Sequence, residues 1–322
     1  MKISVSFSDE LIRIDLFLSQ RLREFSRTNI QKMINNSQVK VNGELVKKNS
    51  ILNYGDIIEV NLIEKQNNSK LSLEKWEYPL DVIYKDKDFA IINKPRGIIS
   101  HPAKGNYNKT IVNIILDIFK DDIKSSVDPL RPGIVHRLDK DTTGVMIIPF
   151  NEHAHWKIAE QFQERTIKKE YIAITWGSFD KENGVLENFL NRNKKNPMKF
   201  EVSNNGKIAK SKFELIKKSK CLSIVKFLPK TGRTHQIRVH CKELGYPIFG
   251  DELYGGGIKK SKEYSKDINI QLNEYYSSVG GFCLHAESIA FNHPTSGKEV
   301  SFKANPDKSF EQIFQDILNE RI

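Results

Sequence analysis

A polar stretch without hydrophobic periodicity, KQNNSKLSLEK at residues 65–75, divides the chain into two parts. Polar, aperiodic segments of this kind are typical of linkers between domains. The chain has 322 residues, which suits two domains at roughly 150 residues each. We therefore predict one domain over residues 1–64, a linker over 65–76 and a second domain over 77–322.

Residues 1–64 have the pattern of a small α+β module. Apolar residues at helical spacing predict a helix over 14–25 and a second one that carries Ile30 on its buried face. An Asn-Gly pair favours a type I′ turn and hence a hairpin over 39–46. With a last strand over 56–63, we expect helix, helix, hairpin and strand to complete the topology.

From residue 77 onward, apolar runs of strand length are interspersed with a few helical patterns. Strands are predicted over 89–95, 144–150, 170–177, 210–216, 221–229, 282–291 and 298–303. Helices are predicted over 111–120, 153–164, 234–245 and 309–319. Because this order lacks regular βαβ alternation, we predict an α+β fold with a mixed, largely antiparallel central sheet and flanking helices.

The segment from Gly255 to Gly281 differs from its surroundings because it is polar and bounded by glycines. Segments of this length without an evident element are uncommon inside a compact domain. We expect either a flexible surface excursion or a loop that becomes ordered on a ligand.

The charge balance restricts the class of partner. Lys and Arg total 51 and Asp and Glu total 40, a net charge of +11. This excess favours an anionic partner, nucleic acid above all, with a membrane surface as the alternative. The three cysteines are too few and too far apart for a disulfide framework, which indicates a reducing compartment. Without a signal peptide or an apolar run of spanning length, we expect a soluble, cytoplasmic protein.

The segment HRLDKDTTGVMII at residues 136–148 is the first that contains candidate catalytic residues. His136, Arg137 and Asp139 lie in a turn-prone stretch directly before an apolar strand, where a sheet can hold a side chain rigidly. The flanking cations favour the ionised form of Asp139, which can serve as a nucleophile, a base or a metal ligand. Taken alone, the same residues also fit a capped turn with exposed charges.

The segment is not a kinase catalytic loop. Its aspartate falls one position late, and the chain has neither the kinase Gly-rich loop nor D-F-G.

Two further segments offer polar side chains. Arg233, His235 and Arg238 lie across a turn and a helix, and an Arg238 guanidinium can form a two-point contact with a carboxylate or phosphate. Tyr171 begins a strand and could present its ring to a base. Taken alone, these features also fit a surface helix and a core tyrosine.

In order and spacing, HRLDKDTTG, KKEYIAI, TGRTHQIRVH and LHAESIAFNHPTSGKEVSF resemble the RluA family of pseudouridine synthases. The resemblance runs from about residue 77 to 305, and residues 1–64 resemble the S4-type RNA-binding domain of its RluC and RluD types. The related RsuA family usually has Gly where this chain has His136. The family more often reads T-S-G where this chain has Thr-Thr-Gly, which keeps a hydroxyl.

The resemblance implies an isomerase that converts uridine to pseudouridine in RNA, with 23S ribosomal RNA or the assembling large subunit as partner. It implies that Asp139 is catalytic, that Tyr171 packs on the uracil, and that Arg238 pairs with Asp139. Arg137 is the candidate to fill the gap left by the flipped-out uridine. The alternatives are the same chemistry on another RNA such as tRNA, or a non-catalytic ribosome-assembly factor. We expect a monomer without metal or other cofactor.

Further RNA contacts are expected on both domains, because basic side chains there can bind phosphates. The expected residues are His136, Arg233 and His235 in the second domain, and Arg21, Arg27, Lys32 and Lys40 in the first.

Overall fold

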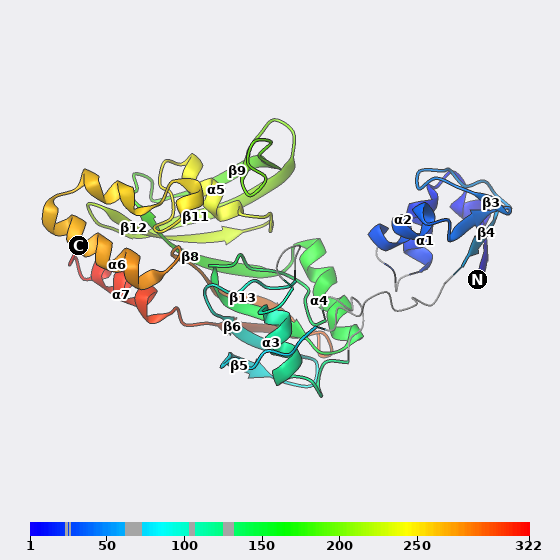
Figure 1. The fold of residues 1–322 in the computed structure, drawn as a ribbon, viewed down its shortest axis with the longest axis horizontal. Helices are drawn as coiled ribbons and strands as arrows, with labels where there is room; N and C mark the ends of the chain where they lie inside the picture. Colours follow the sequence, from blue (N-terminus) through cyan, green and yellow to red (C-terminus); the bar gives the residue numbers. More distant parts are fainter. Residues whose placement is uncertain (23–24, 26, 62–72, 103–106, 125–131) are drawn as a thin grey trace. The chain divides into compact units, whose positions relative to one another are not determined.

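The computed structural model describes the chain except for residues 23–24, 26, 62–72, 103–106 and 125–131. The chain folds into two compact units, Met1–Ser72 and Leu73–Ile322 (Figure 1). The predicted linker therefore lies largely outside the described residues. Its last part belongs to the second unit, because Trp76 donates its N–H to the Asn113 carbonyl at 3.1 Å and the Asn113 amide donates to the Glu74 carbonyl at 2.6 Å.

In its described residues, the first unit is a four-stranded antiparallel sheet with two helices. Its elements are β1 (Lys2–Ser4), η1 (Phe7–Asp9), α1 (Ile14–Arg21), α2 (Arg27–Asn35), β2 (Val39–Val41), β3 (Glu44–Leu45) and β4 (Ile57–Val60). The second helix, the hairpin and the last strand agree with the prediction, whereas the first helix, predicted over 14–25, ends at Arg21. The predicted topology lacks β1, which pairs with β4 at the sheet edge, because three residues are too few to show the strand period.

One apolar core holds this unit together. Phe17 of α1, Ile30 of α2 and Ile58 of β4 are fully buried in it. The hairpin turn has the left-handed backbone that its residues favour, with φ at +52° for Asn42 and +84° for Gly43. Helical spacing and turn chemistry were therefore sufficient to predict most of this module.

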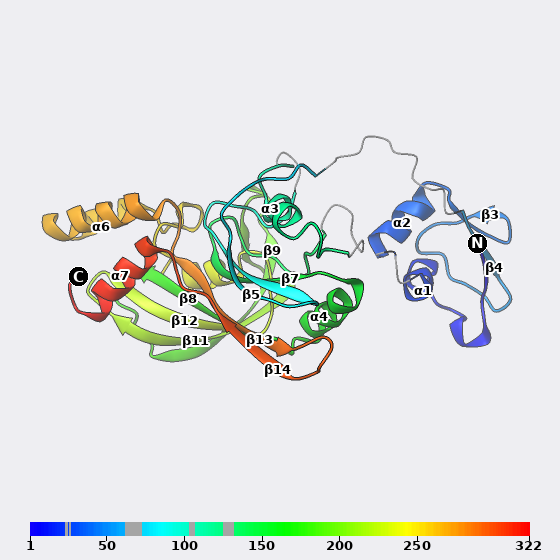
Figure 2. The ribbon, with the colours of Figure 1, turned by 90° about the horizontal axis from the view of Figure 1, so that it is seen from below.

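In its described residues, the second unit contains a mixed ten-stranded sheet with the order β10-β9-β11-β12-β8-β13-β7-β6-β5 and β14 paired to β13 (Figure 2). The strands are β5 (Asp81–Lys85), β6 (Phe89–Lys94), β7 (Thr143–Pro149), β8 (Lys168–Trp176), β9 (Asn183–Arg192), β10 (Phe200–Val202), β11 (Lys207–Lys218), β12 (Leu222–Pro229), β13 (Leu284–Asn292) and β14 (Glu299–Lys303). Among the described pairings between these ten strands, only β7 with β13 is parallel. The predicted mixed, largely antiparallel sheet is confirmed.

Three of these strands, β5, β9 and β10, are absent from the prediction. They lie at or next to the two edges of the sheet. Along most of β9, exposed residues alternate with half-buried ones, so the strand has no apolar run to reveal it.

Helices cover the sheet on several sides. They are α3 (Ile111–Ile118), α4 (Glu152–Glu164), α5 (Gln236–Glu243), α6 (Lys266–Val279) and α7 (Lys308–Leu318). α3 packs on β6 and β7, α4 packs on β7 and β13, and α7 packs on β11 and β12. In the described part of the chain, no helix is both long and apolar enough to cross a membrane.

The segment 255–281 is neither a flexible excursion nor an irregular loop. It forms the short helix η3 (Ile258–Glu263) and the 14-residue α6, which lies beside α7 (Figures 1 and 2). Leu272 and Tyr275 are buried in the main core, and the Tyr275 hydroxyl donates to Asp316 of α7 at 2.7 Å. The prediction was wrong because these apolar residues are widely spaced among polar ones.

The parallel pairing of β7 with β13 brings two backbones unusually close. Gly144 has φ at +112°, and a Cβ built there would lie 2.1 Å from the Ala286 carbonyl oxygen. Only glycine fits this position. The approach fixes the start of β7, and with it the turn that contains Asp139.

Candidate active site

A pocket of about 600 Å³, open to solvent, lies in the second unit. It is formed by the turn before β7, the start of β8, the loop after β12 and α5. Asp139, Tyr171 and Arg238 all line it, although they are far apart in sequence. Three further residues singled out from the sequence line the same pocket, namely Arg137, Arg233 and His235.

Asp139 and Arg238 are in direct contact. Nη1 of Arg238 donates to Oδ2 of Asp139 at 3.2 Å, and both side chains are largely buried, with exposed fractions of 7% for the arginine and 17% for the aspartate. The carboxylate is therefore held against a fixed cation while part of it stays accessible from the pocket.

Arg238 is fixed by a second carboxylate that the sequence analysis missed. Its Nε and Nη2 donate to the fully buried Asp251 at 2.7 and 2.9 Å. The guanidinium also packs on two rings, 4.9 Å from the centre of Tyr254 and 4.4 Å from that of Phe282. Burial opposes the charged form, but the carboxylates outweigh it and raise the pKa of Arg238. The only sequence signal was an aspartate directly after an apolar run and a glycine.

His235 lies beside this pair. Its Nδ1 is 2.8 Å from the Tyr254 hydroxyl, and its Nε2 is 3.8 Å from Oδ2 of Asp139. Burial lowers the pKa of His235 and outweighs the opposing effect of Asp139, so the neutral imidazole is favoured.

Tyr171 is placed by the central strands of the sheet. In β8 it pairs with Phe227 of β12 on one side and with Ala286 of β13 on the other. Burial, followed by the charge of Asp139, raises the pKa of the Tyr171 phenol. The hydroxyl is therefore protonated at neutral pH and can donate a proton or a hydrogen bond.

His136 and Arg137 have different surroundings, although they are neighbours in sequence. Arg137 is exposed at the pocket mouth. His136 accepts a hydrogen bond from the Ile147 N–H at 2.9 Å and stacks on Phe162 at 4.8 Å. Burial, followed by the charge of Lys169, lowers the pKa of His136 to about 3. These are the contacts of a structural residue, and the prediction that His136 binds RNA gains no support from them.

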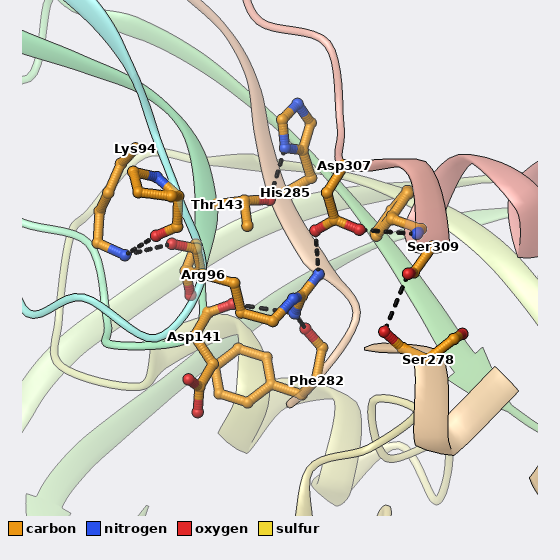
Figure 3. A network of polar contacts seen from close by, with 12 residues as sticks. Lys94, Arg96, Asp141, Thr143, Ser278, Phe282, His285, Asp307 and Ser309 are labelled. Carbon is orange, nitrogen blue, oxygen red and sulfur yellow. Dashed lines mark hydrogen bonds and ion pairs between the residues drawn. The ribbon is translucent and has the colours of Figure 1, made fainter. Parts of the chain in front are cut away.

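Lys94, shown in Figure 3, supports the turn that carries Asp139. The fully buried Lys94 ammonium donates to the carbonyl oxygens of Pro95, Lys140 and Thr142 at 2.8 to 2.9 Å. Burial lowers the pKa of Lys94 to about 7, against the opposing effects of Asp141 and Asp139. The three carbonyls use all three donors of the ammonium, so the role of Lys94 is to stabilise the backbone of this turn.

Arg96 adds further contacts next to this turn (Figure 3). It donates to the backbone carbonyls of Asp141 and Phe282 and forms an ion pair with Asp307 at 2.7 Å. Because the Phe282 ring packs on Arg238, Arg96 connects both members of the Asp139–Arg238 pair. The sequence analysis did not identify Lys94 or Arg96.

The basic residues expected to bind RNA in the first unit are exposed, but two of them form ion pairs. Arg21 contacts Asp9 at 2.7 Å, and Arg27 contacts the buried Asp15 at 2.9 Å. Lys32 and Lys40 are exposed as well. Arg233, in the second unit, donates from Nε to the Ile208 carbonyl at 3.0 Å, which leaves its other nitrogens to the pocket.

Asp86, Asp88 and His293 place possible metal-ligand atoms within 4.8 Å of one another. His293 Nδ1 accepts from the N–H groups of Thr295 and Ser296, so Nε2 carries the hydrogen that it directs at Asp86, 2.9 Å away. These contacts describe a hydrogen-bonded turn and give no indication of a metal.

Family models match both units of the chain. The family model for RNA pseudouridylate synthase matches residues 88–243, and the S4 domain model matches residues 12–58. An uncharacterized RNA pseudouridine synthase of Bacillus subtilis, YlyB, is 32% identical over 98% of this chain and 97% of its own length. The ribosomal large subunit pseudouridine synthase D of Borreliella burgdorferi is 35% identical over 88% of this chain and 90% of its own.

The fold is shared with solved structures. Human RNA pseudouridylate synthase domain containing 4 superimposes with a TM-score of 0.55 at 22% identity, covering 74% of this chain and 93% of that chain. The chain belongs to the RNA pseudouridine synthase family, with an S4 domain at its N-terminus. It is an RNA isomerase.

Proposed function

We propose that this pseudouridine synthase modifies uridine in 23S ribosomal RNA of the large subunit and that Asp139 is its catalytic residue. The observation that carries the catalytic assignment is the Asp139–Arg238 contact at 3.2 Å in a pocket also lined by Tyr171. The choice of substrate is supported by the S4 domain and by the relatives named for the large ribosomal subunit.

In the proposed reaction, the bond between C1′ of the ribose and N1 of uracil breaks. The base then turns, and a bond forms between C1′ and C5, after which the hydrogen of C5 leaves as a proton and N1 takes up a proton. The Asp139 carboxylate has three possible actions, namely attack on C1′, attack on the ring, or removal of a proton from the sugar. Arg238 keeps it charged and oriented in each of them.

In this proposal, Tyr171 contacts the uracil base, and Arg137 occupies the space that the base leaves in the RNA. Tyr171 packs on the uracil inside the pocket, and its protonated hydroxyl is available for proton transfer. A uridine must leave its stack to reach Asp139, at a cost of a few kcal/mol. Arg137, exposed at the pocket mouth, fills the vacancy.

The proposal includes no metal and no other cofactor. We also propose that the protein acts as a cytoplasmic monomer. In it, the S4 domain supplies phosphate contacts that bind the RNA without reading its sequence.

The test is tritium release from 23S transcript labelled at C5 of uridine, with wild type compared with Asp139→Asn. A carboxamide has nearly the shape of the carboxylate but lacks its charge, so we expect release by wild type alone and similar RNA binding by both proteins. Release by Asp139→Asn would contradict the catalytic assignment. Release from tRNA transcript but not from 23S transcript or assembling subunits would overturn the substrate. No release from any RNA would favour a non-catalytic binding factor.

A further inference from the structure

Lys169 is a pocket residue to which neither the fold nor the proposed chemistry gives a role. It lies in β8 two positions before Tyr171, so the two side chains leave the same face of the sheet. Its ammonium is 5.9 Å from the centre of the Phe162 ring in α4. It is also 3.9 Å from the point where a Cβ of Gly232 would lie, which places it on the wall between α4 and the loop before α5.

Within the described part of the chain, the Lys169 ammonium has no hydrogen bond and no ion pair. Burial lowers its pKa to about 8. A partly desolvated ammonium without an anion is costly, and proteins normally pair such a group. The adjacent Lys168 illustrates the usual arrangement, since its exposed ammonium contacts Glu299 at 2.7 Å.

The described lining of the pocket cannot supply the missing anion. Asp139 is its only acidic member, and Arg238 already holds that carboxylate. The cations Arg137 and Arg233 lie on the same pocket, so this wall carries an excess of positive charge. A ligand that matches it must bring negative charge, and in RNA the negative charge lies on the phosphates.

We propose that the Lys169 ammonium binds a phosphate of the RNA strand, at or next to the nucleotide whose base enters the pocket. This inference rests on the proposed function for its RNA substrate. It makes Lys169 a substrate-binding residue that fixes the backbone while Asp139 and Tyr171 act on the sugar and base.

The experiment compares Lys169→Met with wild type in binding a fluorescein-labelled 2′-O-methyl oligouridylate over a range of salt concentrations. Met keeps the apolar stem and the volume but removes the charge. We expect binding to weaken about tenfold and the slope of log affinity against log salt to fall by about 0.7, the value for one phosphate contact on a single strand. Lys168→Met is the matched control, because it removes the neighbouring charge outside the pocket, and it should leave the slope unchanged.

A second probe separates phosphate from base. On the same oligouridylate with a neutral methylphosphonate backbone, wild type and Lys169→Met should bind equally. If the variant is weakened by the same factor on both probes, Lys169 contacts the base or sugar and the proposal is wrong. An unchanged salt slope would overturn it too.

Lys169→Arg keeps the charge and should retain the wild-type slope, which separates loss of charge from damage to the fold. The slopes do not depend on turnover. A slope change in Lys169→Met, together with no tritium release by wild type, would therefore overturn the proposed function and leave the phosphate contact standing.

Discussion

Asp251 accepts two hydrogen bonds from Arg238, 2.7 Å from Nε and 2.9 Å from Nη2, while Nη1 of the same guanidinium contacts Asp139 at 3.2 Å. The two bonds to Asp251 therefore fix the orientation of the guanidinium. With the rings of Tyr254 and Phe282 also packed on it, its position is set before any substrate arrives. The geometry of Asp139 thus depends on a buried carboxylate that does not itself line the pocket.

Asp251→Asn should lower both stability and turnover. The substitution leaves a buried guanidinium with one carboxylate fewer, which costs about 3 kcal/mol in comparable buried pairs. Thermal unfolding and tritium release would measure the two effects. Asp267→Asn, on an exposed residue of α6, should change neither. Full turnover by Asp251→Asn would show that Asp139 does not need this support.

Lys94→Met should destabilise the turn that carries Asp139. Three carbonyls lose their donor, and the one of Thr142, which lies in a buried contact, retains its desolvation penalty. The expected cost is roughly 1–3 kcal/mol in unfolding free energy. Urea denaturation checks the loss, with the exposed Lys87→Met as control. A variant as stable as wild type would mean that the turn is held mainly by other contacts, such as those of Ser100 with Leu138.

Arg137→Gln should reduce turnover more on paired than on unpaired uridines. Only a paired, stacked uridine leaves a vacancy to be filled, and its extrusion costs a few kcal/mol. Tritium release from an RNA hairpin and from the same sequence without pairing would be compared. Arg165→Gln, exposed at the end of α4, serves as control. Equal losses on both RNAs would contradict a gap-filling role.

His240 should make stability depend on pH. It is fully buried, both ring nitrogens lack a partner in the described residues, and burial lowers its pKa from 6.5 to about 4. The unfolded chain therefore takes up a proton first as pH falls. The stability due to neutral His240 is complete above about pH 6.5 and is lost as pH falls toward 4, by about 3 kcal/mol.

Urea midpoints between pH 7 and 4.5 would measure this loss. His240→Leu should make the dependence less steep, and the remainder is due to groups such as His136 and His235, whose pKa values burial also lowers. His153→Gln, on an exposed histidine, should leave the dependence as in wild type. A dependence as steep in His240→Leu as in wild type would assign the effect to other groups.

The features that could be predicted from the sequence are those that depend on residues close together in the chain. Asp139, Tyr171 and Arg238 stood out because each belongs to a local motif, and they line one pocket. Their chemical roles remain predictions. Asp251 and Arg96 were missed, because their importance comes from contacts between segments distant in sequence, which no local period reveals. The helix α6 was missed because its few buried residues are hidden among polar ones.

The parallel pairing of β7 with β13 also determines when the enzyme becomes complete during synthesis. Gly144 packs closely against the Ala286 backbone, and Arg238 packs on Phe282. The residues of the pocket are therefore held by segments that come late in the sequence. Non-local contacts of this kind form late, after the intervening chain is available. A nascent polypeptide that ends before β13 therefore contains Asp139 but lacks the segment against which the start of β7 packs. We therefore expect activity to begin only after β13 has left the ribosome.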